Sequence, residues 1–119
     1  MSPPSSEGVR RIEVAAGLLR DGELVLVCQR SATGPHPLRW EFPGGKLESG
    51  ESPEACLVRE LREELDIEAT VGVRLASVEH RYPDGPHVRV HFHAVTGHDG
   101  TIRNRVFERI AWHPRTRLD

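Results

Sequence analysis

The segment that most constrains the fold of this chain runs from Gly45 to Ile67 and reads GKLESGESPEACLVRELREELDI. Ser52 is a residue type that commonly caps a helix, and Pro53 suits the first helical position because its missing N–H would have no partner there. Apolar residues then recur at spacings of three and four, as on one face of a helix. The segment therefore predicts a helix over residues 53–65, which Asp66 ends in a left-handed conformation.

Outside this helix, the chain alternates between strand-like and turn-like segments. Strand patterns cover residues 9–19, 24–28, 40–42, 69–80, 87–96 and 109–112, separated by turn or loop signals at residues 21–22, 31–39, 43–45, 83–86 and 97–100. One helix among about five strands predicts an α/β or α+β domain built on a mixed sheet.

Length and apolar content restrict the class of protein. The chain has 119 residues, enough for one core, and we expect residues 1–8 to be a disordered lead-in to a single domain over residues 9–119. The start of the chain lacks the apolar core of a secretory signal, and no apolar run is long enough to span a membrane. We therefore expect a cytoplasmic protein with no membrane partner. Cys28 and Cys56 lie in apolar patterns and are predicted to be buried free thiols.

The charge balance argues against one class of partner. The net charge is −2 with the histidines neutral, whereas proteins that bind a nucleic-acid polymer usually present a basic surface. A small anionic substrate would instead need local cations or a metal ion.

Three glutamates, Glu60, Glu63 and Glu64, are spaced at i, i+3 and i+4, so they share one face of the predicted helix. Unpaired like charges at this spacing destabilise a helix by roughly 0.2–0.5 kcal/mol per pair, and a bound cation would reverse that penalty. Mg²⁺ prefers oxygen ligands, carboxylates among them. The pattern therefore indicates a candidate metal site.

The same helix has a second interpretation, as an ordinary charged amphipathic helix with Arg59 and Glu63 as an i,i+4 ion pair. The residues before the helix favour the metal site. Gly44-Gly45 leaves the backbone free to approach a ligand closely. Glu51 lies where Arg59 can reach it, and we expect these two residues to form an ion pair that fixes the loop to the helix.

Eight positions of the segment resemble the Nudix box, in which a Gly is followed six residues later by a Glu, then by Arg-Glu-aliphatic-x-Glu-Glu and a closing aliphatic residue. These positions are Gly45, Glu51, Arg59, Glu60, Leu61, Glu63, Glu64 and Ile67. With the upstream sequence WEFPGGKLE (residues 40–48), the chain looks most like the MutT-type nucleoside triphosphate pyrophosphohydrolases, including relatives that act on cytidine nucleotides. The resemblance is dense over residues 40–70 and looser but colinear over residues 12–112.

This resemblance implies an α/β/α sandwich, in which the box forms a loop–helix–loop on the mixed sheet. It implies that Glu60, Glu63, Glu64 and the carbonyl of Gly45 hold Mg²⁺ or Mn²⁺, with Glu60 also acting as the general base. Arg59 and Glu51 complete the implied catalytic set. Metal-activated water would attack the internal phosphorus of a nucleoside triphosphate, giving a nucleoside monophosphate and pyrophosphate.

The residues that contact the substrate are less strongly defined. The resemblance implies Arg30, Phe42, Gly44 and Lys46. For Arg30 a solvated position at a strand end is an equal alternative, and for Lys46 an ordinary surface position. For Phe42 a plain core position is the alternative. Trp40 is expected to be a plain core residue.

Four features depart from the family pattern or stand outside it. Asp66 replaces a Gly near the end of the box. Glu108 is the only acid where the family often has an extra metal ligand, and a plain strand-edge carboxylate is the favoured interpretation because it is about two residues out of register. The chain stops at Asp119, where relatives continue into a second helix, so we expect that helix to be missing. His91 and His93 lack a third zinc ligand at suitable spacing and are expected in a polar cleft or on the surface.

The leading hypothesis is therefore Mg²⁺-dependent hydrolysis of a nucleoside triphosphate, with oxidised or other non-standard nucleotides included, by a monomer or homodimer. One alternative keeps the chemistry and changes the substrate to another nucleoside diphosphate derivative, such as ADP-ribose. Another is an inactive Nudix domain that binds a nucleotide or serves as an interaction module.

Overall fold

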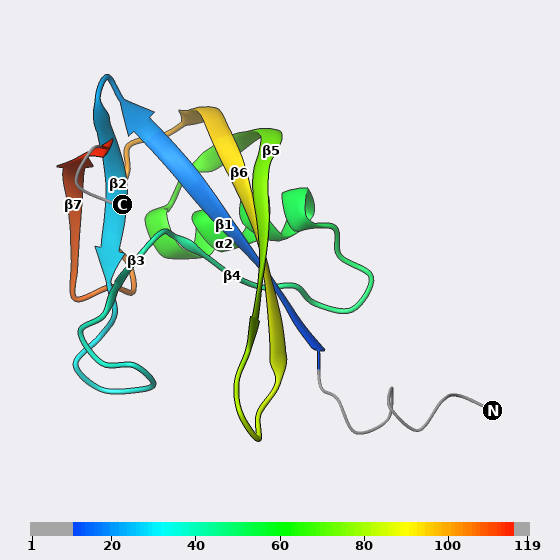
Figure 1. Cartoon of the computed structure of the whole chain (residues 1–119). Helices are drawn as coiled ribbons and strands as arrows, with labels where there is room; N and C mark the ends of the chain where they lie inside the picture. Colours follow the sequence, from blue (N-terminus) through cyan, green and yellow to red (C-terminus); the bar gives the residue numbers. More distant parts are fainter. Residues whose placement is uncertain (1–10, 116–119) are drawn as a thin grey trace.

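The computed structural model describes residues 11–115, so the expected lead-in of residues 1–8 lies outside the described residues. Strand β1 (Arg11–Asp21) is the centre of the sheet (Figure 1). One edge of β1 pairs in parallel with β6 (His87–Asp99). Its other edge pairs antiparallel, first with β4 (Gly44–Lys46) and then with β2 (Leu24–Gln29), so the predicted mixed sheet is confirmed.

The remaining strands extend the sheet on both sides. Strand β2 pairs antiparallel with β3 (Trp40–Glu41) and with β7 (Arg109–Pro114). On the far side, β6 pairs antiparallel with the long edge strand β5 (Glu68–Arg81), and Figure 1 shows this hairpin extending well beyond the rest of the sheet. The sheet of the described residues has seven strands.

Helix α2 (Pro53–Leu65) has the bounds that the sequence predicts. The side chain of Ser52 accepts a hydrogen bond from the backbone N–H of Ala55 at 3.1 Å, which satisfies a donor that the first turn leaves free. Asp66 ends the helix at φ 60°, and its N–H donates to the carbonyl of Arg62. Within residues 11–115, no helix has the length and apolar character that a membrane span requires.

The core lies between α2 and one face of the sheet. It contains nine buried residues: Ala15, Leu19, Leu26, Cys28, Cys56, Leu57, Leu61, Leu65 and Ile67. Gly17 allows the helix to pack closely, because a Cβ there would lie 3.1 Å from Val95 Cγ2 and 3.5 Å from Leu57 Cδ2. Both cysteines are buried free thiols, as predicted. Burial of each large aliphatic side chain contributes about 1.5–3 kcal/mol.

Two predicted turns are wrong. Residues 43–45 do not simply stop the preceding strand, because Gly44–Lys46 forms β4 against β1. Only glycine fits at Gly44, where any Cβ would collide with the carbonyl of Ala15. Likewise, residues 97–99 are not a turn: Thr70, Ala69 and Glu68 pair with them and prolong β6 to Asp99.

Three side chains lie elsewhere than expected. His91 and His93 are buried rather than in a cleft or on the surface, because the Glu13 carboxylate and the Gly72 carbonyl satisfy one ring nitrogen of each, at 2.7 and 3.0 Å. Trp40 is 42% exposed rather than a core residue. It belongs to a two-residue strand at the edge of the sheet, where only β2 pairs with it.

Candidate functional site

Arg59 fixes the loop of residues 46–51 to helix α2. Its Nε and Nη2 donate to the two carboxylate oxygens of Glu51 at 2.8 and 2.9 Å, and Nη2 also donates to the carbonyl of Lys46 at 3.2 Å. The Glu51 side chain is only 13% exposed, and the hydrogen bonds from Arg59 lower its pKa to about 2. The expected Glu51–Arg59 ion pair is therefore present, in the two-pronged geometry that arginine favours.

Glu60 lies directly against the backbone at Gly45. A Cβ at position 45 would be 2.5 Å from Oε2 of Glu60, so the carboxylate occupies the space that any other side chain would need. Arg59 donates through Nη1 to the other carboxylate oxygen, Oε1, at 2.7 Å. The glycine and its neighbouring backbone thus form a cradle that holds one carboxylate in place.

Glu64 is the half-buried partner of Glu60. Its Oε1 accepts a hydrogen bond from the N–H of Gly44 at 3.1 Å. Burial raises the pKa of Glu64 well above its usual range, and the hydrogen bond and charge of Glu60 raise it further. Two adjacent carboxylates in a poorly solvated position cannot both ionise readily unless a cation lies with them.

Glu63 lies apart from this pair. Its side chain is 57% exposed and approaches Nη1 of Arg59 at 3.4 Å. Within residues 11–115, no three His, Cys, Asp or Glu side chains form a group that could hold a metal ion. The residues that fit a divalent cation are Glu60 and Glu64 beside the Gly45 backbone, since they supply carboxylate oxygen donors close to one another. The carbonyl of Gly45 accepts from the thiol of Cys56 at 3.4 Å.

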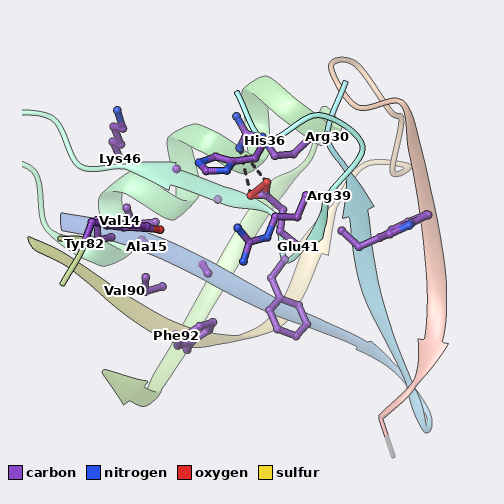
Figure 2. A pocket seen from close by; sticks show the side chains of 16 residues that line it. Val14, Ala15, Arg30, His36, Arg39, Glu41, Lys46, Tyr82, Val90 and Phe92 are labelled. Atoms are coloured by element: carbon purple, nitrogen blue, oxygen red, sulfur yellow. Dashed lines mark hydrogen bonds and ion pairs between the residues drawn. The ribbon is translucent and has the colours of Figure 1, made fainter. Parts of the chain in front are cut away.

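A cavity of about 510 Å³ opens beside β4 (Figure 2). Its apolar floor comes from β1 and β6: Val14, Ala15, Ala16, Val88, Val90 and Phe92. The ring of Phe42 meets that of Phe92 edge-on, with centroids 6.1 Å apart. Arg30, Phe42, Gly44 and Lys46, the expected substrate residues, all line this one cavity.

Arg30 is already engaged within the protein. Its Nη1 donates to Oε1 of Glu41 at 2.9 Å, and its Nε donates to the carbonyl of Pro35 at 2.9 Å. Glu41 therefore stands in the cavity wall as a carboxylate neutralised by arginine. These contacts pair Arg30 within the protein, while its side chain remains 36% exposed.

Sequence reasoning missed three polar side chains of this wall: His36, Arg39 and Glu41. One signal was available, because Arg39 and Glu41 flank Trp40 and alternate residues of an extended segment face the same side. A smaller cavity of about 200 Å³ lies beside Glu64 and Arg30. Val106 and Phe107 line it, whereas Glu108 is exposed and does not.

Comparison with known proteins identifies the family. The NUDIX domain model matches residues 9–119. The chain is 42% identical over 105 residues to the CTP pyrophosphohydrolase of Escherichia coli K12. This match covers 87% of this chain and 76% of that protein. It is 41% identical over 88 residues to an 8-oxo-dGTP diphosphatase of Proteus vulgaris, covering 73% of this chain and 78% of that protein.

Solved structures give the same fold. The solution structure of the E. coli ORF135 protein superposes with a TM-score of 0.78 at 39% identity, covering 93% of this chain and 77% of that one. The crystal structure of a MutT Nudix hydrolase from Burkholderia pseudomallei gives 0.79 at 23% identity, covering 88% and 84%. The chain therefore belongs to the Nudix hydrolase family, is of the MutT type, and is an enzyme that acts on phosphoric anhydride bonds.

Proposed function

We propose that this enzyme hydrolyses a nucleoside triphosphate to a nucleoside monophosphate and pyrophosphate with the help of a divalent cation. The observation that carries the proposal is the pairing of Glu60 with the half-buried Glu64 beside the backbone of Gly44 and Gly45. Nudix hydrolases generally use divalent metal ions. Mg²⁺, or Mn²⁺ in its place, prefers carboxylate oxygens and binds phosphate oxygens in the same shell.

The proposed ligands are the carboxylates of Glu60 and Glu64 and the carbonyl of Gly45, with Glu63 as a further carboxylate on the same helix. When bound, the cation would neutralise charge that develops on the phosphate oxygens and would lower the pKa of a bound water. Glu60 is the proposed acceptor of the proton that this water loses. Arg59 donates to both Glu51 and Glu60, so it orients the base and ties it to the loop.

The reaction exchanges one phosphorus–oxygen bond for another. The oxygen of water forms a bond to the internal phosphorus, and the bond from that phosphorus to the bridging oxygen breaks. Pyrophosphate then leaves with the electron pair. Gly44 and Lys46 line the cavity, and the N–H of Gly44 donates to Glu64. Lys46 is the proposed cation for the phosphate chain.

The substrate proposal follows from the cavity and the relatives. An apolar floor with a nearby aromatic ring suits a flat base, and the volume lies within the range for small-molecule sites. The named activities of the two relatives make CTP and 8-oxo-dGTP the first nucleotides to test. ADP-ribose belongs in the same panel as the alternative substrate class.

The test is a panel of nucleotides incubated with the full chain and Mg²⁺, with products identified by ³¹P NMR. We expect a monophosphate and pyrophosphate, no turnover after chelation with EDTA, and a fall in kcat of about a hundredfold or more for Glu60→Gln. Release of orthophosphate instead, or turnover of ADP-ribose alone, would contradict the substrate and bond proposed. Calorimetric binding of a nucleotide without turnover would identify an inactive binding module.

A further inference from the structure

We propose that Arg39 donates hydrogen bonds to a carbonyl oxygen of the substrate's nucleobase, an inference that rests on the proposed function above. Arg39 lines the 510 Å³ cavity and is exposed. Within residues 11–115, its guanidinium has no ion pair and no hydrogen bond, although the carboxylate of Glu41 lies in the same wall. It is therefore a cation in the cavity that none of the described residues neutralises.

The other cations of the cavity have different surroundings. Arg30 has Nη1 committed to Glu41 and Nε committed to the carbonyl of Pro35. Lys46 belongs to β4, the strand that begins at Gly44, whose N–H donates to Glu64. Lys46 is the cation proposed above for the phosphate chain, which must reach the carboxylates. Arg39 immediately precedes β3. It therefore lies at the opposite end of residues 39–46 from Lys46.

The apolar residues of the cavity favour the base, rather than the phosphate chain, as the ligand of Arg39. Val14, Val90 and Phe92 make an apolar floor that can cover the face of a base and leaves its edge to be read by the wall. In Figure 2 the side chain of Arg39, the residue before β3, reaches toward this floor. A guanidinium carries only donors, in a planar fork, so its partner on the base must be an acceptor.

A carbonyl oxygen is the strongest such acceptor on a nucleobase edge. Cytosine, uracil, thymine and guanine carry one, and adenine does not. The inference therefore names a substrate class: nucleotides whose base bears a carbonyl group. Arg39 would be a specificity-determining residue, with its effect confined to those bases.

The experiment compares the wild-type chain with Arg39→Ala, Arg39→Lys and Arg20→Ala, using CTP, GTP and ATP. Arg20 is exposed near the end of β1 and does not line the cavity, so its loss controls for a change of net charge. For Arg39→Ala we expect KM for CTP or GTP to rise roughly tenfold or more, with kcat and the Mg²⁺ dependence unchanged. KM for ATP should change less than twofold, and Arg20→Ala should behave as wild type.

Three results would overturn the inference. An equal rise in KM for ATP would mean that Arg39 contacts the phosphates or ribose, and no change for any nucleotide would mean that it is only a solvated surface residue. Full recovery by Arg39→Lys would show that charge alone matters, since lysine keeps the charge and loses the fork.

Failure of the proposed function is measured separately. If the wild-type chain turns over no nucleotide, the same variants are compared by calorimetry with the α,β-methylene analogues of CTP and ATP. Selective weakening of the CTP analogue by Arg39→Ala would support the base contact without catalysis. Equal weakening, or no binding by the wild-type chain, would overturn it.

Discussion

Gly45 and Glu60 share one small volume: the carboxylate of Glu60 fills the position that a side chain at residue 45 would take. The absence of a side chain is therefore what brings the backbone and the proposed base together. This contact gives a physical reason for glycine at position 45, the first residue of the box. Backbone flexibility alone does not explain why a side chain is excluded there.

Gly45→Ala should damage activity far more than folding. Its Cβ would displace the Glu60 carboxylate, and a misplacement of about 1 Å at a reacting group commonly costs roughly a hundredfold in rate. We expect kcat/KM to fall by about that factor with an unchanged circular dichroism spectrum. Gly97→Ala is the matched control, because a Cβ there meets nothing within 4 Å. Near wild-type activity in Gly45→Ala would argue against the close placement of Glu60.

The Glu51–Arg59 ion pair should make stability depend on acid pH. The folded-state pKa of Glu51, about 2, is below its ordinary value of 4.5, so the pair stabilises the fold above about pH 4.5. That contribution is lost as the pH falls from 4.5 toward 2. Urea denaturation at pH 7 and pH 3 should show a smaller difference between Glu51→Gln and wild type at pH 3. Glu23→Gln, at an exposed turn, is the control, and a difference that does not shrink would contradict the prediction.

Magnesium should raise the melting temperature through Glu60 and Glu64. A ligand at a hundred times its Kd stabilises the folded state by about 2.7 kcal/mol, which is a shift of several degrees for a domain of this size. Glu64→Gln should abolish the shift, whereas Glu63→Gln should keep most of it, because Glu63 is exposed and directed to Arg59. Differential scanning fluorimetry with Mg²⁺ and with EDTA measures this. Loss in both variants would make Glu63 as essential a ligand as Glu64.

Leu61→Ala should test the contact between helix and sheet. Leu61 is fully buried in the core, and removing such a side chain costs about 2–5 kcal/mol of unfolding free energy. Leu61→Met keeps most of the volume and should cost less than about 1.5 kcal/mol. Equilibrium urea denaturation gives both values. Similar losses in the two variants would show that shape rather than volume decides the packing.

The predictions that succeeded rest on local signals. Ser52, Pro53 and Asp66 act within a few residues of themselves, so the bounds of α2 could be read without knowing the rest of the fold. The spacing of the glutamates and Arg59 is likewise fixed by the helix. These residues carry most of the proposed metal site.

The predictions that failed depend on contacts between distant parts of the chain. Residues 44–46 form a strand only because β1 lies beside them, and the buried His91 depends on Glu13, from the other end of the chain. The composition of the cavity has the same origin, since Arg39 faces an apolar floor made by β1 and β6. Local sequence patterns do not predict such contacts, because the order of the strands in the sheet determines which distant residues meet.

The parallel pairing of β1 with β6 has a consequence for synthesis in the cell. The two strands lie near opposite ends of the chain, so the central ladder cannot form until the ribosome has released β6. Until then, the edge of β1 that pairs with β6 has no partner strand. Such long-range pairing is slow, and an unpaired strand is prone to aggregation. A nascent chain that stalls before β6 should therefore be a substrate for chaperones, although its complete helix and box have already emerged.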